Sequence, residues 1–403
     1  MTTTINNEHK ELNFSSEREQ SQTCLNSAEH EKNQGRKVLN VPNLRFPEFV
    51  GEWEKCKLED VMNFSTTRVN SSELNEDNYV STENMLQDYQ GIVEAKSVPE
   101  DVNVISFSCG DILISNIRPY LKKVWKATFN GGCSSDVFVL KANDNIESDY
   151  LHYVIANDKF INFVMSGAKG VKMPRGDKKQ MKTYSLSLPQ IQEQHKIARL
   201  LSLLDERITT QNKIIDKLQS LIRGIRNDVF GKFRKSVGVN AMVGDVLSYE
   251  QPQPYIVEDT EYTAEGIPVL TANKAFVLGY TSETDGIYDK GDCIIFDDFT
   301  LDCKYVDFPF KVKSSAIKIL TVKDKELLRY TFEFMKYLDL STDEHKRHYI
   351  AETQNQELFL PTAQVVRTIA HAFSALSSRM KTVTKQRNMF ELQKQYLLRQ
   401  MFI

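Results

Sequence analysis

An internal repeat constrains this chain more than any other feature of its sequence. Residues 188–230 align without a gap on residues 360–402, at a constant offset of 172, and eleven of the 43 aligned pairs are identical. These pairs are Leu188/Leu360, Pro189/Pro361, Gln192/Gln364, Ile197/Ile369, Ala198/Ala370, Ser202/Ser374, Leu204/Leu376, Arg207/Arg379, Thr210/Thr382, Lys213/Lys385 and Phe230/Phe402. Such self-similarity indicates a duplicated structural unit.

The segments that precede each copy repeat more faintly. Residues 110–114 (GDILI) recur as 291–295 (GDCII), and residues 134–140 (SSDVFVL) recur as 314–320 (SSAIKIL). Each pair has the pattern of a turn followed by a short β-strand. The predicted order is therefore globular domain, long helix, globular domain, long helix.

Both predicted helices carry apolar residues at alternating steps of four and three, which is the seam of a coiled coil. In the first helix the seam positions are Ile197, Leu201, Leu204, Ile208, Gln211, Ile215, Leu218, Ile222, Ile225 and Val229. In the second helix they are Ile369, Phe373, Leu376, Met380, Val383, Arg387, Phe390, Lys394, Leu397 and Met401. We expect the two stripes to pair as an antiparallel coiled coil about 50 Å long, at about 1.5 Å per residue. The alternative is two ordinary amphipathic helices, each packed on its own domain.

Composition and charge bound the class of protein. Hydrophobic content of 41% and charged content of 26% are ordinary for a soluble globular chain. The net charge of -3 does not indicate a nucleic-acid binder. Because the chain has no run of eighteen apolar residues and no apolar stretch at its N-terminus, we expect a cytoplasmic protein without a membrane span. The six cysteines include no CxxC pair, so they are expected to be reduced thiols.

The repeated block resembles a known family. Leu188-Pro-Gln-Ile-Gln-Glu-Gln-His-Lys-Ile197, followed by a helix rich in Gln, Lys and Leu, is similar to the conserved region of specificity (S) subunits of type I restriction-modification systems. The segment from Val41 to Leu58 looks like the start of the same family. The second copy departs from the pattern, since it reads Leu360-Pro-Thr-Ala-Gln-Val-Val-Arg and lacks the usual glutamate and second glutamine.

The resemblance implies an α+β fold with two α/β target-recognition domains in tandem, each followed by a long helix. It implies that each domain reads one half of a split double-stranded DNA site, while the helices set the gap and dock two adenine-methyltransferase subunits. A translocating restriction subunit is a further implied partner. This chain would hold no cofactor, whereas the methyltransferase subunits would use S-adenosylmethionine. The expected segments are a disordered leader (1–40), recognition domain 1 (41–187), spacer helix 1 (188–232), recognition domain 2 (233–359) and spacer helix 2 (360–403).

Motifs for catalysis are absent from the sequence. It has no NPPY or DPPY tetrapeptide, no GxGxxG and no GxxxxGK[ST]. The nearest nuclease-like string is Asp292 with Asp302-Cys-Lys304, a pattern that arises often by chance. His345 and His348 are three residues apart without a third ligand nearby, so we expect them to face solvent or DNA rather than a metal. The chain is therefore predicted not to be an enzyme.

Clustered cations mark the candidate DNA contacts. Residues 117–126 of the first domain hold four cations and no acid, and residues 166–182 hold six cations and one acid. Arg118, Arg175 and Asn116 are predicted to reach bases, with Tyr120 beside them, and the lysines to anchor phosphates. The predicted anchors in this domain are Lys122, Lys123, Lys126, Lys169, Lys172, Lys178 and Lys179.

The second domain is less basic, and its contacts are expected elsewhere. Asp297 and Asp298 replace Asn116 and Ile117 of the first copy, while Lys304 matches Lys123 in this alignment. We expect readout from the loop before the second helix, through Lys346, Arg347 and His348. Three alternatives remain open for these features: a solvated basic face, a scaffold that holds partner proteins without touching DNA, and a single-chain nuclease.

Overall fold

The computed structural model describes residues 39–272, 275–322, 324–342 and 346–403. The fold is mixed α+β, and the chain divides into two compact units, Met1–Ser202 with Lys394–Ile403, and Leu203–Gln393. Nearly all of the expected leader lies outside the described residues. None of the described helices has the length and apolar character needed to cross a membrane.

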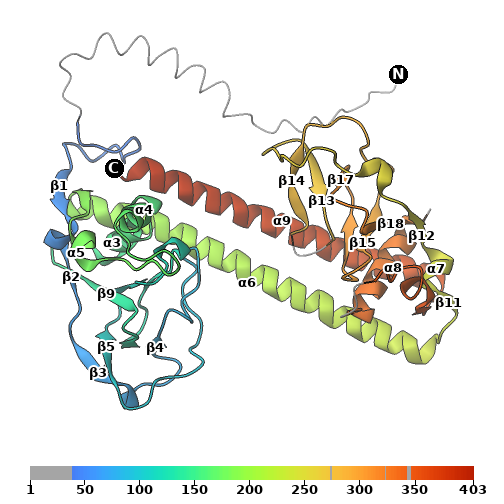
Figure 1. The fold of residues 1–403 in the computed structure, drawn as a ribbon, viewed down its shortest axis with the longest axis horizontal. Helices are drawn as coiled ribbons and strands as arrows, with labels where there is room; N and C mark the ends of the chain where they lie inside the picture. The colour runs from blue at the N-terminus through green and yellow to red at the C-terminus, as the bar shows by residue number, and fades with distance from the viewer. Residues whose placement is uncertain (1–38, 273–274, 323, 343–345) are drawn as a thin grey trace, which may run out of the picture. The chain divides into compact units, whose positions relative to one another are not determined.

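The first unit is built from short strands and short helices (Figure 1). Its strands are β1 (Glu54–Lys57), β2 (Met62–Phe64), β3 (Arg68–Asn70), β4 (Tyr79–Val80), β5 (Asn103–Phe107), β6 (Ile112–Ser115), β7 (Val124–Lys126), β8 (Gly131–Cys133), β9 (Val137–Ala142) and β10 (Ser185–Leu188). Its helices are α2 (Leu58–Val61), η1 (Ser71–Glu73), η2 (Pro119–Leu121), α3 (Ser148–Ile155), α4 (Asp158–Ser166) and α5 (Lys178–Lys182).

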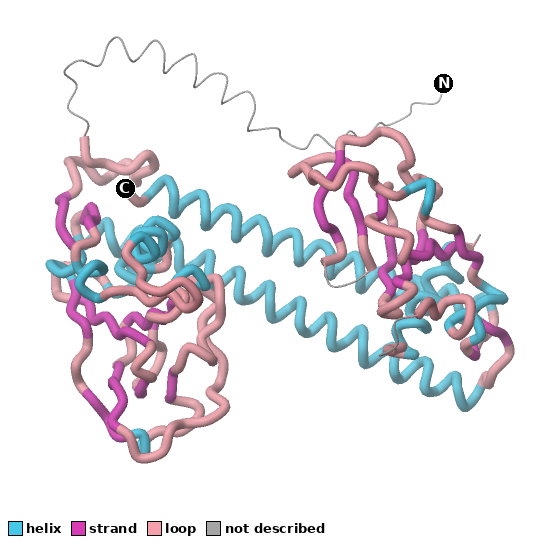
Figure 2. Tube along the Cα trace, in the orientation of Figure 1, coloured by secondary structure: helices cyan, strands magenta, loops and turns pink. Residues whose placement is uncertain are grey.

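The second unit has a similar inventory. Its strands are β11 (Ala241–Met242), β12 (Ser248–Glu250), β13 (Ile267–Leu270), β14 (Val277–Thr281), β15 (Cys293–Asp297), β16 (Cys303–Val306), β17 (Lys311–Val312), β18 (Ile317–Thr321) and β19 (Glu357–Leu358). Its helices are α7 (Val243–Val246), η3 (Gln253–Tyr255), α8 (Lys325–Leu338) and η4 (Thr353–Asn355). The long helices are α6 (Ile191–Ser236) and α9 (Ala363–Met401), which Figure 2 shows in cyan.

The central sheets of the two units share one strand order. It is β2-β9-β6-β7 in the first unit and β12-β18-β15-β16 in the second. Both central strands follow a turn and are almost fully buried, because one sheet face packs on a second small sheet and the other on a helix, α3 or α8. The repeats GDILI/GDCII and SSDVFVL/SSAIKIL therefore mark equivalent turn-strand segments, as the sequence predicts.

The register of these sheets shifts the alignment of the first repeat by one residue, because Leu113 pairs with Val139 as Ile295 pairs with Ile319. Asn116 N donates to Asp136 O, and Asp298 N donates to Ala316 O, so Asp298 rather than Asp297 occupies the position of Asn116. Likewise Lys123 O accepts from Ser115 N, and Asp302 O accepts from Asp297 N, so Asp302 occupies the position of Lys123. The expected match of Lys304 with Lys123 is wrong, because Lys304 pairs with Ile295 as Trp125 pairs with Leu113.

The seam positions of both long helices are shielded from solvent as the periodicity predicts. All ten on α6 and all ten on α9 are buried or half-buried, whereas Leu203 and Leu221 beside the α6 seam are 39% and 49% exposed. Inside the second unit, the Arg207 guanidinium lies 5.5 Å from the centre of the Phe390 ring, and Phe230 shares a core with Val366. Within that unit the two helical segments therefore run in opposite directions.

The phenylalanine that ends each repeat is a core residue. Phe230 packs edge-on against Tyr330 and Phe334 in the second unit, with ring centres 5.3 and 5.4 Å apart. Phe402 stacks on Tyr150 in the first unit at 5.2 Å. Each long helix is thus anchored at its end by an aromatic side chain, which gives the repeated Phe a packing role.

Candidate nucleic-acid interface

The two basic stretches of the first unit, which the sequence places about fifty residues apart, form one surface. Arg118 N donates to Pro174 O at 2.7 Å, and Gly176 N donates to Asn116 O at 3.0 Å. A bridge between Ile117 and Arg175 completes the junction. The turn between β6 and β7 is thereby joined through its backbone to the loop between α4 and α5.

The β6–β7 turn has an unusual backbone. Arg118 and Lys122, which flank the buried Pro119, both adopt left-handed conformations, with φ of 51° and 54°. Non-glycine residues rarely occupy this region, and such strain is concentrated at functional sites. Tyr120 at the apex is 47% exposed, so its ring is available to a ligand.

Three of the seven predicted phosphate anchors of the first unit pair with nearby acids. Lys169 lies 3.6 Å from Asp177 and Lys122 lies 2.8 Å from Asp158, while Lys126 pairs with Asp149. Exposed ion pairs of this kind contribute only about 0–1 kcal/mol each. The lysines can therefore exchange an acid for a phosphate at little cost. Lys172 and Lys179 are exposed and, within the described residues, form no ion pair.

Arg175, the predicted base reader, is also paired. Its guanidinium donates to Asp136 Oδ1 at 2.7 Å. Asp136 belongs to the turn that enters β9, and its backbone also accepts from Asn116. Asp136 is not among the residues predicted from the sequence, because nothing in its local pattern marks it as the partner of a residue 39 positions away.

Three predicted contacts lie partly or wholly inside the fold. Lys123 Nζ donates to Thr82 O at 2.6 Å, and burial, with Arg118 nearby, lowers its pKa. Lys178 lies 4.6 Å from the ring centre of Phe138, and burial lowers its pKa as well. The Asn116 side chain is also buried. These three side chains pack against the residues beneath the basic surface, so the prediction that they touch DNA is not supported by their positions.

The second unit places a loop on its central turn in the same way. Asp298 Oδ1 accepts from His348 N at 3.1 Å and from Tyr349 N at 2.8 Å, which fixes residues 346–355 against the β15–β16 turn. The expectation that His348 faces solvent or DNA is wrong, since it is only 1% exposed and its Nδ1 lies 2.9 Å from Glu352. His345 lies outside the described residues.

Two other predicted contacts on this loop remain accessible. Arg347 is exposed, with its guanidinium 5.9 Å from the centre of the Phe299 ring. Lys346 Nζ pairs with Glu352 at 2.9 Å. Lys304 points to Asp302, 3.3 Å away, and is only partly exposed. The basic character of this surface is therefore weaker than in the first unit.

The two carboxylates of the nuclease-like string, Asp292 and Asp302, each pair with other side chains and lie far apart along the sheet. Asp292 accepts from Tyr305 and pairs with Lys325, whereas Asp302 pairs with Lys336 at 2.9 Å. They lie at opposite ends of the β15–β16 hairpin, where Cys293 pairs with Val306 and Phe296 with Cys303. Across the part of the chain that the structure describes, no group of three His, Cys, Asp or Glu residues could hold a metal ion.

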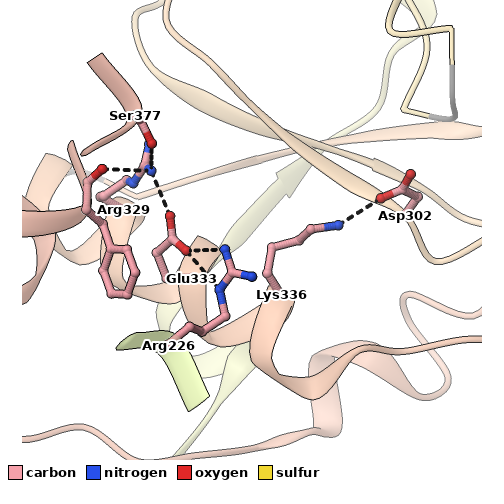
Figure 3. A network of polar contacts seen from close by, with 7 residues as sticks. Arg226, Asp302, Arg329, Glu333, Lys336 and Ser377 are labelled. Atoms are coloured by element: carbon pink, nitrogen blue, oxygen red, sulfur yellow. Dashed lines mark hydrogen bonds and ion pairs between the residues drawn. The ribbon is translucent and has the colours of Figure 1, made fainter. Parts of the chain in front are cut away.

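A buried charge network fastens α8 to both long helices within the second unit (Figure 3). Glu333, 1% exposed, accepts from Arg226 of α6 at 2.6 Å and from Arg329 at 2.7 Å. Arg329 also donates to Ser377 and to Phe373 O on α9. The sequence gives no sign of this network, since its members are spread over about 150 residues.

The repeated block at the start of α6 has a structural explanation. Glu193, fully buried, accepts from the Arg45 guanidinium at 2.8 Å through each carboxylate oxygen and from Trp53 Nε1 at 3.2 Å. Gln194 donates to Pro189 O at 2.9 Å. At the start of α9 the position of Glu193 holds Val365, and only residues 237–240 join α6 to β11. Before β11 the chain therefore has no counterpart of residues 41–53, the segment that supplies Arg45 and Trp53 to Glu193.

Comparisons with known proteins show which proteins this chain is similar to. Residues 51–220 match the family described as the type I restriction modification DNA specificity domain. The chain is 39% identical over 172 residues to the specificity subunit of the type I restriction enzyme EcoR124I/EcoR124II of Escherichia coli, a match that covers 38% of this chain and 42% of the relative. It is 27% identical over 126 residues to the Escherichia coli EcoDI specificity subunit, covering 31% of this chain and 28% of the relative. The chain thus spans less than half the length of these curated relatives.

A solved structure extends the likeness at the level of the fold. The S subunit of a type I restriction-modification system from M. genitalium superposes with a TM-score of 0.64 at 14% identity, covering 90% of this chain and 99% of that one. At this level of identity the likeness shows the fold alone.

Proposed function

We propose that this chain, which through residues 51–220 belongs to the family of type I restriction modification DNA specificity domains, recognises the DNA sequence on which a larger restriction-modification complex acts. It is a recognition subunit rather than an enzyme. The observation that carries the proposal is the joined basic surface of the first unit, where Arg118 N bonds to Pro174 O. Two loops held together by backbone bonds present several cations in a fixed arrangement, which suits a regular array of phosphates.

The second unit reads the other half of the site through a different chemistry. Its β15–β16 turn carries Asp298 and Asp302 at the positions of Asn116 and Lys123, but lysines pair with both acids. Arg347 and Lys346 lie on the loop that this turn holds. Because the units share a sheet order and differ in these loops, they can recognise different half-sites.

The long helices form the spacer between the half-sites, as an antiparallel coiled coil. The shielded seams on α6 and α9 and the contact of Arg207 with Phe390 support this arrangement. A rod of α-helix resists compression, so its length selects one gap between the two half-sites.

The catalytic partners are two adenine-methyltransferase subunits, which would use S-adenosylmethionine, and a translocating restriction subunit. An exposed apolar stripe on α9 fits such docking: Met389, Leu392 and Tyr396 are 59%, 65% and 55% exposed at helical spacing. The equivalent residues of α6 are Lys217, Ser220 and Gly224, so the two helices offer different surfaces. The complex would act in the cytoplasm, where its DNA lies.

The decisive experiment is to co-express the chain with its methyltransferase partner in a host without modified adenines and to sequence the methylated bases. We expect one split motif, two short defined halves separated by a constant number of unspecified pairs. Methylation without any split motif, or none at all from a partner that binds the chain, would instead favour a scaffold that does not read DNA.

A further inference from the structure

The loop between α4 and α5 ends in an apolar tip that the basic surface does not explain. Val171 is 103% exposed and Met173 is 47% exposed, with Lys172 between them. Single apolar residues on a surface are common. Two apolar residues at the apex of one cationic loop need an explanation, because the flanking Lys169 and Arg175 would attract that apex to the phosphates of DNA.

The tip is held in a preformed hairpin. Lys169 N donates to Arg175 O at 3.1 Å and Arg175 N donates to Lys169 O at 2.9 Å. Gly170 has a φ of +97°, and the next three residues turn the chain before the buried Pro174, whose carbonyl is bonded to Arg118. The side chains of Val171 and Met173 are therefore presented to solvent from a braced support.

From this geometry we infer that Val171 and Met173 contact the 5-methyl group of a thymine in the half-site read by the first unit. The inference rests on the proposed function. The tip is a loop closed by one β-bridge, and a protrusion of this kind fits the major groove, about 12 Å wide, better than the minor groove, about 6 Å wide. In the major groove the thymine methyl is the apolar feature of the base-pair edges, and apolar side chains recognise it.

The test uses the complete complex with its methyltransferase and a duplex carrying the site mapped by sequencing. Each thymine of the site is replaced in turn by deoxyuridine, which removes the methyl group and leaves base pairing intact. We expect one replacement to weaken binding about fourfold, equivalent to the roughly 0.8 kcal/mol of one buried methyl-sized group. The Val171→Thr and Met173→Gln variants, which keep the side-chain size, should lose that sensitivity.

Two control variants separate this contact from general effects. Lys172→Ala should weaken binding to every duplex and keep the deoxyuridine effect, and Val50→Thr, at a valine that is 82% exposed elsewhere in the unit, should change neither. The inference is overturned if no deoxyuridine duplex binds more weakly, or if the two tip variants remain as sensitive as the parent. A wild-type complex that recognises no split site refutes the proposed function itself, whereas a split site without a deoxyuridine effect refutes only this contact.

Discussion

Lys178 carries the same charge as Lys172 and Lys179, yet its ammonium lies over the rings of Phe64 and Phe138. Position on the fold therefore divides these lysines into two groups that the sequence cannot separate. An exposed lysine gains a phosphate and releases a counterion on binding DNA. A lysine whose stem and charge pack on aromatic rings contributes mainly to the shape of the loop.

Replacing both Lys172 and Lys179 by Ala should weaken DNA binding equally for all sequences. Because each lost phosphate contact removes about 0.9 from the slope of log K against log salt, the slope should fall by about 1.8. Fluorescence anisotropy of the complex across a salt series measures it.

The comparison variant in that experiment is Arg175→Ala, which should alter base preference at one position by on the order of 1–3 kcal/mol. An unchanged salt slope in the double lysine variant, or an Arg175→Ala complex with unaltered affinity and preference, would show that this loop does not touch DNA.

Glu193 is the residue on which the N-terminal arm depends. Its hydrogen bond with Arg45 holds the pKa of that guanidinium above its usual range. Glu193→Ala leaves Arg45, whose side chain is 15% exposed, without its counter-charge, so we expect a loss of about 3 kcal/mol in the free energy of unfolding.

Both tryptophans, Trp53 and Trp125, belong to the first unit, so urea unfolding followed by tryptophan fluorescence reports on Glu193→Ala directly. The neighbouring Gln192→Ala, at an exposed position, should change the free energy of unfolding by less than about 0.5 kcal/mol. If Glu193→Ala changes the free energy of unfolding as little as Gln192→Ala does, residues 41–53 do not contribute to stability.

Among the helices of the two units, α8 is held in place by buried ion pairs. The corresponding helices of the first unit, α3 and α4, are held mainly by apolar packing. Replacing Glu333 by Ala leaves Arg226 and Arg329 without their counter-charge, and breaking such a network typically costs about 3–5 kcal/mol. Hydrogen exchange of the α8 amides should therefore become faster, with little change in strands β6 and β9.

The matched control on α6 is Asp228→Ala, which removes an exposed pair with Lys232. A surface pair contributes about 0–1 kcal/mol, so α8 exchange should stay as in the parent. If Glu333→Ala leaves the α8 amides equally protected, the network is a packing detail without a stabilising role.

At the scale of the whole molecule, the spacer hypothesis concerns the helices α6 and α9 together. Arg207 lies against Phe390, so Gln211 faces the neighbourhood of Arg387 in an antiparallel pair. Inserting one heptad after each of these two residues preserves the seam and lengthens the rod by about 10 Å. Sequencing the methylated bases should show the same half-sites separated by about two to four more unspecified pairs, at about 3.4 Å per pair.

A heptad inserted in α6 alone is the control, since it makes α6 about 10 Å longer than the partner helix that it pairs with and should abolish methylation. New half-site bases, or an unchanged gap in an active double insertion, would show that the helices do not set the spacing.

Features of this protein that depend on local order could be predicted from its sequence. The 43-residue repeat, the 4-3 seam and the two turn-strand repeats predicted the long helices and the equivalent strands of the two units, because periodicity and turn chemistry act over a few neighbouring residues. The family resemblance rested on the same local blocks. The expected match of Lys304 with Lys123 is wrong, because Lys304 occupies the position of Trp125 in the strand register. A sequence alignment contains no information on the hydrogen bonds that set this register.

Tertiary structure alone decided which residues within those segments are available. It joined two basic stretches through Arg118 and Pro174, buried His348, half-buried Lys178 against aromatic rings, and left Val171 exposed. It also paired Glu193 with Arg45, a residue 148 positions away. Such contacts join residues far apart in the chain, and whether a side chain is covered depends on what folds against it, so no local pattern specifies them.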